Sequence, residues 1–557
     1  MTESVALLIA LFLPLAGAIL LWIVAPAGRD TVRYTALGVS LLTLLAAAAV
    51  VNAYPLAGSH TEAFAVTDYP WLTDGLFDIH FHIGVDGLGV WMFALSALLF
   101  VTSVLVSWEA IKDREPLFYA MLLLLEFGCL GVFTARDLIL FYVFFEFTLI
   151  PLFFLIGIWG SEERRYAAIK FFLFTLAGSL LTFLGLLAIV LWDYQTSGQF
   201  RFSIPELTTS LTTDPMPVDM QVWVFLALFA GFAIKVPLFP VHTWLPLAHV
   251  QAPTAGSVIL AGILLKIGVY GFVRFSMPML PEATVICTPW ILGLSVAGII
   301  YGALVALAQG DMKRLIAYSS VSHLGYCMLG LFSLNALGMN GGLLQMVNHG
   351  LSTGGLFACV GMLYERYHTR EIKHYGGIAR RLPILAFFML VFTFSSIGLP
   401  GLNGFPGEFL VLLGMFQRGW QDYTQLEQTT SLVLAVLAVS GVVLGAWYML
   451  QLVQRVFFGP LKEPVQHADA VQHLETSHEQ HSVPDLSLRE ILALAPLVVF
   501  IVWIGLKPHD FLPPLNQPVR TVLSGTDPIL LRRVLERHST VQAPVADQPQ
   551  ETIARVR

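Results

Sequence analysis

Apolar runs of about 20 residues recur along nearly the whole chain, and they constrain its fold more than any other feature. A helix of that length crosses the ~30 Å hydrocarbon core of a bilayer. Backbone polar groups cannot stay unpaired in lipid, and the runs are too long and continuous for barrel strands. With 56% hydrophobic and 12% charged residues, the chain lacks the charged surface of a soluble protein of this length. We therefore expect an all-α polytopic membrane protein.

The apolar runs predict about 14 transmembrane helices. Their expected starts are near residues 4, 31, 85, 116, 137, 164, 221, 251, 285, 312, 339, 383, 429 and 487. The stretches 54–83 and 194–220 are polar, and we expect them to be outside loops without spans. The run at 5–24 has no basic region before it and no small-residue cleavage site, so we interpret it as the first span.

Lysine and arginine are concentrated in the loops that follow odd-numbered spans. The positive-inside rule places these loops in the cytoplasm and the N-terminus outside. The basic residues of the tail, among them Arg520, Arg532, Arg533 and Arg537, fit this orientation poorly. They lie far from a span, however, where the rule is weaker.

Four ionisable residues lie inside apolar runs of four different spans: Glu146, Lys235, Lys266 and Glu408. Each costs about 2.5–3.5 kcal/mol on insertion scales. A single one is explained by a structural ion pair or a hydrogen bond between helices, and a Glu146–Lys235 pair needs no transport role. Two acids and two bases on four spans favour an ion pathway. Glu126, in MLLLLEFGCLGVF, is a tentative fifth member for which an interhelical hydrogen bond is an equal explanation.

Two histidines extend this set, because His323 and His349 also lie within expected spans. Histidine titrates near neutrality when unperturbed. A lone membrane histidine is more often a packing residue, but these two have Ser and Asn neighbours that can order water. The neighbours are Ser319, Ser320, Ser322, Asn348 and Ser352.

Two spans carry prolines and glycines beside their charged residue. Pro237 and Pro240 follow Lys235, and the run GLPGLNGFPG at 398–407 precedes Glu408. Proline removes a helical hydrogen bond, and broken helices in corresponding places of two halves mark transporters with inverted repeats. The seventh and twelfth spans are five apart, which predicts two inverted five-helix repeats, spans 4–8 and 9–13.

The spans and loops together predict a domain plan. The expected segments are N-terminal spans and an outside loop (1–115), a first repeat (116–275), a second repeat (285–457), a cytoplasmic loop (458–486), a last span (487–507) and a C-terminal tail (508–557).

Redox or metal chemistry in this chain finds no support in its motifs. The four cysteines, Cys129, Cys287, Cys327 and Cys359, have no CxxC spacing and predict no iron–sulfur or zinc site. Rossmann glycines and a P-loop are also missing. His467, His473, His478 and His481 are irregularly spaced in a polar loop, which favours a solvated linker over a metal site. The composition gives no basis for nucleic-acid binding.

Eight stretches of the sequence resemble a known family. They are GVDGLGVWM (84–92), FFEFTLIPLFFLIGIWG (144–160), RRYAAIKFFLFT (164–175), KVPLFPVHTWLPLAHVQAPTAGSVILAGILLKIGVYGFVRF (235–275), GDMKRLIAYSSVSHLGY (310–326), NHGLSTGGLF (348–357), YERYHTREIKHYGG (364–377) and GLPGLNGFPGEFLVLLG (398–414). The family is the antiporter-like subunits of proton-pumping NADH:quinone oxidoreductase (respiratory complex I). Within it, YERYHTR and the glutamate of FPGEF favour subunit M, the counterpart of mitochondrial subunit 4.

The resemblance implies a role for each residue of the set. Glu146 would pair with Lys235, Lys266 would be the central proton carrier, Glu408 the exit-side carrier, and His323 and His349 the connecting histidines. It also implies a bacterial inner-membrane location, with other antiporter-like subunits, a peripheral redox arm and lipids as partners. FMN, iron–sulfur clusters and quinone would belong to partner subunits, with no cofactor in this chain.

The resemblance has limits, and two other interpretations remain open. Leu247 stands where bacterial relatives often have Asp, and the tail after 507 lies outside the pattern. A subunit of a cation/proton antiporter or of a membrane-bound energy-converting hydrogenase would use the same pathway residues. The chain interpreted as a purely structural membrane scaffold would have four buried charges that each cost free energy and serve no purpose.

Overall fold

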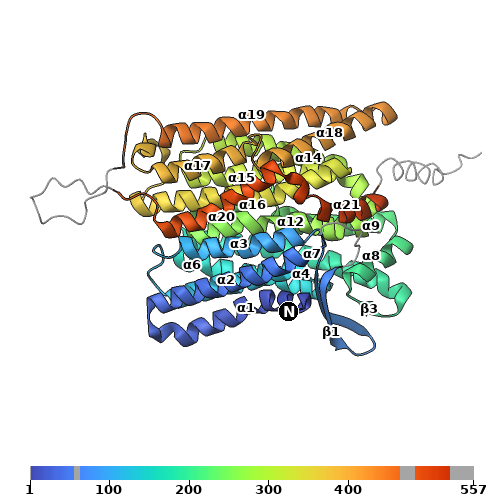
Figure 1. Cartoon of the computed structure of the whole chain (residues 1–557). Helices are drawn as coiled ribbons and strands as arrows, with labels where there is room; N and C mark the ends of the chain where they lie inside the picture. Colours follow the sequence, from blue (N-terminus) through green and yellow to red (C-terminus); the bar gives the residue numbers. More distant parts are fainter. Residues whose placement is uncertain (1, 56–62, 465–482, 527–557) are drawn as a thin grey trace, which may run out of the picture.

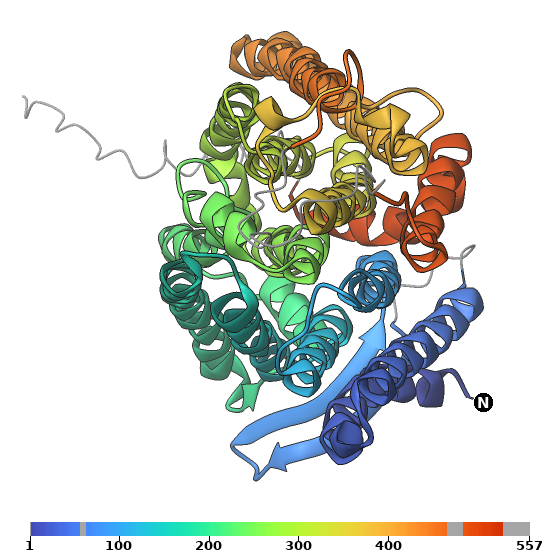
Figure 2. The same ribbon diagram turned by 90° about the vertical axis from the view of Figure 1, so that its left-hand side faces the viewer.

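The computed structural model describes residues 2–55, 63–464 and 483–526. Long helices lie side by side in one bundle, with their axes close to horizontal in Figure 1. Viewed along the axes in Figure 2, α1 and α2 lie at one edge, and the two predicted repeats, coloured cyan to green and green to orange, form neighbouring lobes. The predicted all-α membrane architecture is confirmed in its main feature.

The helices follow the predicted spans in order. They are α1 (Glu3–Val24), α2 (Arg29–Ala53), α3 (Val90–Val106), α4 (Glu115–Thr134), α5 and α6 (Leu138–Phe147 and Leu149–Trp159), α7 (Arg164–Ser197), α9 and α10 (Val218–Lys235 and Trp244–Gln251), the continuous helix α11–α13 (Thr254–Met279), α14 (Pro281–Leu307), α15 (Met312–Phe332), α16 (Ala336–Tyr367), α17 and α18 (Pro383–Ser396 and Gly404–Leu426), α19 (Thr430–Phe457) and α20 (Leu488–Leu506).

Within the described residues, 11 helical segments are long and apolar enough to cross a membrane. The other three expected spans correspond to α3, which is short, to α16, which is rich in glycine and polar residues, and to the interrupted pair α17–α18. The arrangement is consistent with the predicted count.

A small sheet corrects the expectation of plain loops on one side of the bundle. Strand β1 (Phe64–Thr73) pairs antiparallel with β2 (Phe77–Val85), and β3 (Phe200–Arg201) adds to β2 in parallel. The β2 sequence FDIHFHIGV alternates apolar and polar residues, which is the period of a strand. Two short helices, α8 (Ile204–Thr213) and α21 (Pro513–Gly525), lie in the second polar stretch and in the tail.

Both predicted breaks are present. Span 7 is interrupted between α9 and α10, at residues 236–243, and span 12 between α17 and α18, at residues 397–403. Because the two spans are five apart, they cross the bundle in opposite directions, as inverted units require.

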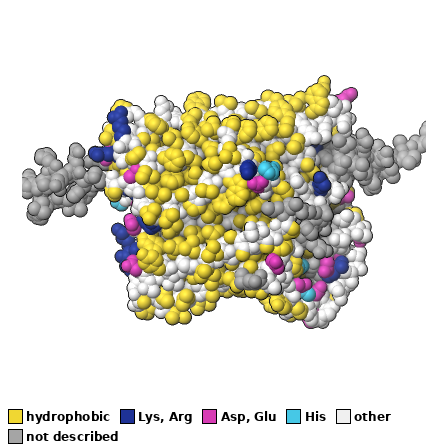
Figure 3. Space-filling view, viewed as in Figure 1, with side chains coloured by type: hydrophobic (Ala, Val, Ile, Leu, Met, Phe, Trp, Pro, Cys, Tyr) yellow, Lys and Arg dark blue, Asp and Glu magenta, His cyan; other side chains and the backbone are white. Residues whose placement is uncertain are grey.

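The surface has a broad apolar belt between two more polar ends (Figure 3). Lysine and arginine side chains gather at the left end, where the chain leaves α19 and returns to α20 (Figure 1). That end is the predicted inside, and the orientation itself stays a prediction. The histidines His467, His473, His478 and His481, and the tail from residue 527 with Arg532, Arg533 and Arg537, lie outside the described residues.

Candidate functional site

Each of the four predicted charged residues lies at an irregularity in its helix. Glu146 is two residues before Thr148, where α5 gives way to α6, and Lys235 is the last residue of α9. Lys266 follows a π-helical turn at Leu260–Leu264. Glu408 lies just after α18 begins at Gly404. Irregular turns release backbone carbonyls from helical pairing, so they can surround a polar side chain inside the membrane.

Lys266 and His349 make the closest side-chain contact of the set. Lys266 Nζ lies 2.6 Å from Nδ1 of His349 and also donates to the carbonyl oxygen of Ala261, in the π turn. Lys266 is fully buried and His349 nearly so. The lysine amine thus has its backbone acceptor within the π turn that precedes it.

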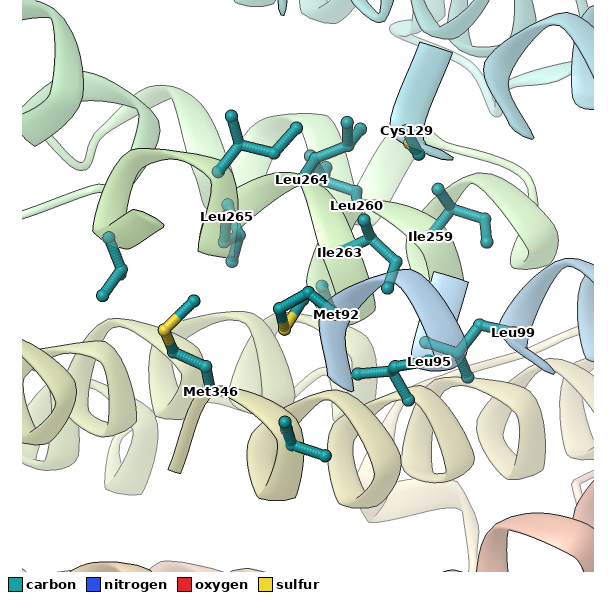
Figure 4. Packing of buried hydrophobic residues seen from close by; sticks show 14 of the residues in the cluster. Met92, Leu95, Leu99, Cys129, Ile259, Leu260, Ile263, Leu264, Leu265 and Met346 are labelled. Atoms are coloured by element: carbon teal, nitrogen blue, oxygen red, sulfur yellow. The ribbon is translucent and has the colours of Figure 1, made fainter. Parts of the chain in front are cut away.

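Small residues allow the helices of this contact to approach. A Cβ on Gly262 would lie 2.3 Å from Leu99 Cδ1, and one on Gly350 would lie 2.5 Å from Leu95 Cδ2 and 2.9 Å from the Gly262 carbonyl oxygen. Glycines at a membrane helix crossing let the backbones pack closely. Figure 4 shows Leu95 and Leu99 of α3 beside Ile259 and Ile263. These apolar side chains cover the helix that carries Lys266.

The row continues from His349 to Glu408. The rings of His349 and His323 are 5.5 Å apart between centroids, and His323 Nδ1 lies 3.4 Å from Glu408 Oε1. Gln345 donates to the same carboxylate oxygen at 3.2 Å. Tyr448 Oη lies 3.5 Å from His323 Nε2. The structure thus brings four of the seven predicted residues into one buried chain, Lys266–His349–His323–Glu408.

Glu146 and Lys235 are not in direct contact. No ion pair within 4 Å joins them in the described part of the chain. Lys235 Nζ instead lies 4.6 Å from the centroid of the Phe145 ring, a cation–π position. Glu146 is half-buried, and its Oε1 has no hydrogen-bond partner among the described atoms. The two side chains are therefore close enough for Glu146 to act electrostatically on Lys235, but they are not in direct contact.

Glu126 belongs to a different part of the bundle. It is fully buried on α4 and accepts a hydrogen bond of 3.1 Å from the Ser40 hydroxyl on α2. This contact is the interhelical hydrogen bond that was the equal alternative for this residue.

Lys235 and Glu408 are not at equivalent places in their repeats. Lys235 precedes the break of span 7, whereas Glu408 follows the break of span 12. Since the two spans run in opposite directions, both charges fall on the same side of their breaks across the membrane.

Sequence reasoning missed His249 on α10. Its side chain is fully buried and stacks on Phe357 at 4.5 Å between ring centroids, and neither ring nitrogen has a hydrogen-bond partner in the described residues. Its charged neighbours are Lys313 and Lys266. A lone histidine in the stretch LPLAHVQAP gave no periodic signal, and the burial of α10 is what singles it out.

Lys313 lines a charged hollow of about 550 Å³ at the predicted inner end. Lys313 is buried and donates to the carbonyl oxygen of Ala252 at 2.6 Å. Lys112 and Arg370, from the basic loops after odd-numbered spans, and Arg33, near the start of α2, also line the hollow.

The arrangement can pass a proton from group to group. Lysine, histidine and glutamate each bind and release one proton, and they occupy successive places in the row. Two positive charges at the Lys266–His349 distance would repel each other, so protonation of both groups at once is unfavourable. A second proton that arrives would therefore displace the first. Within the described residues, no cluster of three or more His, Cys, Asp or Glu side chains could hold a metal.

The fold and the buried row define an antiporter-type membrane subunit. Residues 135–437 match the family described as "NADH:quinone oxidoreductase/Mrp antiporter, TM". Subunit M of the NADH-quinone oxidoreductase of Rhodobacter capsulatus is 42% identical over 89% of this chain and 92% of its own length. NADH-ubiquinone oxidoreductase chain 4 of Chondrus crispus is 41% identical over 90% of this chain and 94% of its own length.

The solved respiratory complex I of Thermus thermophilus with bound NADH contains a chain of the same fold. The two chains superpose with a TM-score of 0.79 at 32% identity, over 93% of this chain and 99% of that one. This protein therefore belongs to the NADH:quinone oxidoreductase/Mrp antiporter family, in its subunit M and chain 4 branch.

Proposed function

We propose that this chain is a proton-translocating membrane subunit of a multi-subunit NADH:quinone oxidoreductase, driven by redox chemistry in other subunits. The single observation that carries the proposal is the buried row Lys266–His349–His323–Glu408. A scaffold gains nothing from such a row, because each ionisable group costs free energy in the membrane. The relatives named after NADH-quinone oxidoreductase support the choice of complex.

Protons would enter from the charged hollow at the inner end. Lys313 lines the hollow, and His249 has both Lys313 and Lys266 as charged neighbours. A proton that reaches Lys266 would pass through His349 and His323 to Glu408 and leave on the outer side. The N-terminus would then lie outside, in a bacterial inner membrane, as the basic loops favour.

Glu146 and Lys235 would gate this movement. A carboxylate at about 4 Å from an ammonium, at an effective dielectric of 20, stabilises the charged lysine by ~4 kcal/mol. Approach of Glu146 would hold the proton on Lys235, and separation would release it towards Lys266. Charge arriving from a neighbouring subunit could drive either step. FMN, iron–sulfur clusters and quinone would be held by partner subunits.

The test uses the intact assembly purified through this chain and reconstituted into vesicles. NADH oxidation by quinone should acidify the vesicle lumen, and a Lys266→Met variant should lower the proton-to-electron ratio. Lys373→Met, at an exposed position outside the hollow, is the matched control. Co-purification with subunits of a sodium/proton exchanger or a hydrogenase, without NADH-driven acidification, would assign the chain to those assemblies instead.

A further inference from the structure

His323 has a different polar neighbour at each of its two ring nitrogens. Nδ1 lies 3.4 Å from Glu408 Oε1, whereas Nε2 lies 3.5 Å from the hydroxyl of Tyr448 on α19. The side chain of Tyr448 is fully buried. Tyr448 is outside the predicted set of residues, so the end of the buried row contains one more group that can give and accept a proton.

The carboxylate of Glu408 determines which nitrogen of His323 releases a proton. An ionised carboxylate only accepts hydrogen bonds, so a neutral imidazole that faces it carries its hydrogen on Nδ1. When that hydrogen moves to Glu408, the ring would become an anion unless Nε2 gains a proton. A proton that crosses His323 must therefore arrive at Nε2.

The ring of His349 does not supply this proton by direct contact. Its centroid is 5.5 Å from that of His323, and its Nε2 has no hydrogen-bond partner among the described residues. Its Nδ1 faces Lys266 at 2.6 Å. The group that contacts the receiving nitrogen of His323 is instead the Tyr448 hydroxyl.

A second buried tyrosine shows what a structural hydroxyl does in this part of the bundle. Tyr326 on α15 is also fully buried, and its hydroxyl donates to the carbonyl oxygen of Ala438 on α19 at 2.8 Å. This bond satisfies a buried hydroxyl and joins two helices. The Tyr448 hydroxyl has a titratable ring as its neighbour, at a distance that is long for a hydrogen bond. Contacts of this kind in a resting site tighten when the proton is transferred.

We propose that Tyr448 is a proton-transfer residue, whose hydroxyl gives a proton to Nε2 of His323 while Nδ1 gives one to Glu408. The O–H bond of Tyr448 and the Nδ1–H bond of His323 break, and Nε2–H and Oε1–H bonds form. A water molecule on the side of His349 returns a proton to the phenolic oxygen. An unperturbed phenol has a pKa of about 10, so the transfers occur together and no phenolate accumulates. This step rests on the proposed function, because it belongs to the same proton row.

Removal of the hydroxyl alone tests the step in the reconstituted assembly. Tyr448→Phe keeps the ring, so we expect the subunit content of wild type, whereas NADH-driven acidification should fall at least about tenfold. Tyr326→Phe is the matched control, because it removes a buried hydroxyl that bonds only to a backbone carbonyl, and acidification should be retained. Wild-type acidification by an assembled Tyr448→Phe variant would overturn the proposal.

A change in the acidity of the hydroxyl gives a readout that a packing role would not move. Difluorotyrosine in place of Tyr448 keeps the hydroxyl but makes it more acidic. Donation needs the protonated hydroxyl, so the loss of acidification at high pH should begin at a lower pH than in wild type. The ionisable groups that face this hydroxyl are His323 and Tyr326 of α15 and Glu408 of α18, and all three stay unchanged. Difluorotyrosine in place of Tyr326 should leave the pH profile as it is. An unshifted profile for the Tyr448 analogue would assign this residue to packing, even if Tyr448→Phe fails to assemble.

Glu408→Gln separates a failure of this step from a failure of the proposed function. If Tyr448→Phe pumps normally and Glu408→Gln does not, the row stands and the proton reaches His323 without Tyr448. If both variants pump normally, the row itself carries no protons.

Discussion

Lys266 Nζ and His349 Nδ1 lie 2.6 Å apart, at hydrogen-bond distance, and both side chains are buried. The contact joins α12 (Leu265–Gly271), a part of the continuous helix Thr254–Met279, to α16, which is far away in the sequence. It exists because the π turn at Leu260–Leu264 turns a carbonyl towards the lysine and because Gly262 and Gly350 meet at the crossing.

Lys266→Arg should lower proton pumping although it keeps the positive charge. Arginine stays protonated at any accessible pH, so it can neither pass its proton to His349 nor accept the next one. We expect the proton-to-electron ratio of the reconstituted assembly to fall by the fraction of the pumped protons that this subunit carries. A ratio equal to wild type would mean that Lys266 serves as a fixed charge.

Lys235→Ala should lower NADH oxidation that is coupled to proton pumping by about tenfold or more, because the proposed gate would lose its proton carrier. Lys235 is on α9 at the edge of a break and has no ion pair within the described residues, so assembly should survive. The subunit content of the purified complex is the control measurement. Normal pumping by a fully assembled variant would remove Lys235 from the pathway.

Gly350→Ala should destabilise the crossing on which the Lys266–His349 contact depends. The added methyl would meet Leu95 Cδ2 at 2.5 Å and the Gly262 carbonyl at 2.9 Å. Overpacking of this kind costs about 1–3 kcal/mol, and we expect lower thermal stability together with lower pumping. Gly293→Ala, on α14 with open space around its Cβ, should change neither. Unaltered stability of the Gly350 variant would show that the helices are free to separate.

The β1–β2 hairpin should lose protection as pH rises. Hydrogen bonds that the ring nitrogens of His80 donate to Asp68 at 2.6 Å and to Asp78 at 2.9 Å raise the pKa of His80 above its usual 6.5. A raised folded-state pKa contributes stability below about pH 6.5, and the contribution is lost as pH rises through the higher value. Amide exchange of the hairpin, corrected for intrinsic rates, should therefore be slower at pH 6 than at pH 9.

The neighbouring histidine is the control for this prediction. Burial lowers the pKa of His82, so His82→Gln should keep the pH dependence while His80→Gln removes it. The same dependence in both variants would locate the titrating group elsewhere in the loop.

Hydropathy was enough to predict the spans and both broken helices, because proline and glycine act locally and lipid requires long apolar runs. The partners of each charge were harder to predict. Helices such as α12 are buried on all sides, so their sequence has no apolar stripe that shows which neighbour they face. That is why the Lys266–His349 contact and the burial of His249 could be seen only in the structure.

The resemblance predicted a Glu146–Lys235 pair, and the structure holds these residues apart. A sequence motif specifies which residues are present but not the distance between their side chains. The hairpin was missed for a different reason. Its alternating pattern in FDIHFHIGV was present, but it lay in a stretch interpreted as a polar loop between spans.

Substitutions of Glu408 test whether this residue carries protons on the outer side or is a structural acid. Its carboxylate contacts His323 at 3.4 Å and accepts from Gln345 at 3.2 Å, directly after the break of span 12. Glu408→Gln keeps the shape and the hydrogen bonding but cannot ionise, so we expect strong loss of pumping with little loss of assembly. Glu408→Asp shortens the reach to His323 but still titrates, and should retain part of the activity. Gln345→Leu is the matched control, because it removes a hydrogen bond to the same oxygen without removing a proton carrier. If Glu408→Gln pumped as well as wild type in the reconstituted assembly, Glu408 would be a packing residue, and the row would have to end at His323.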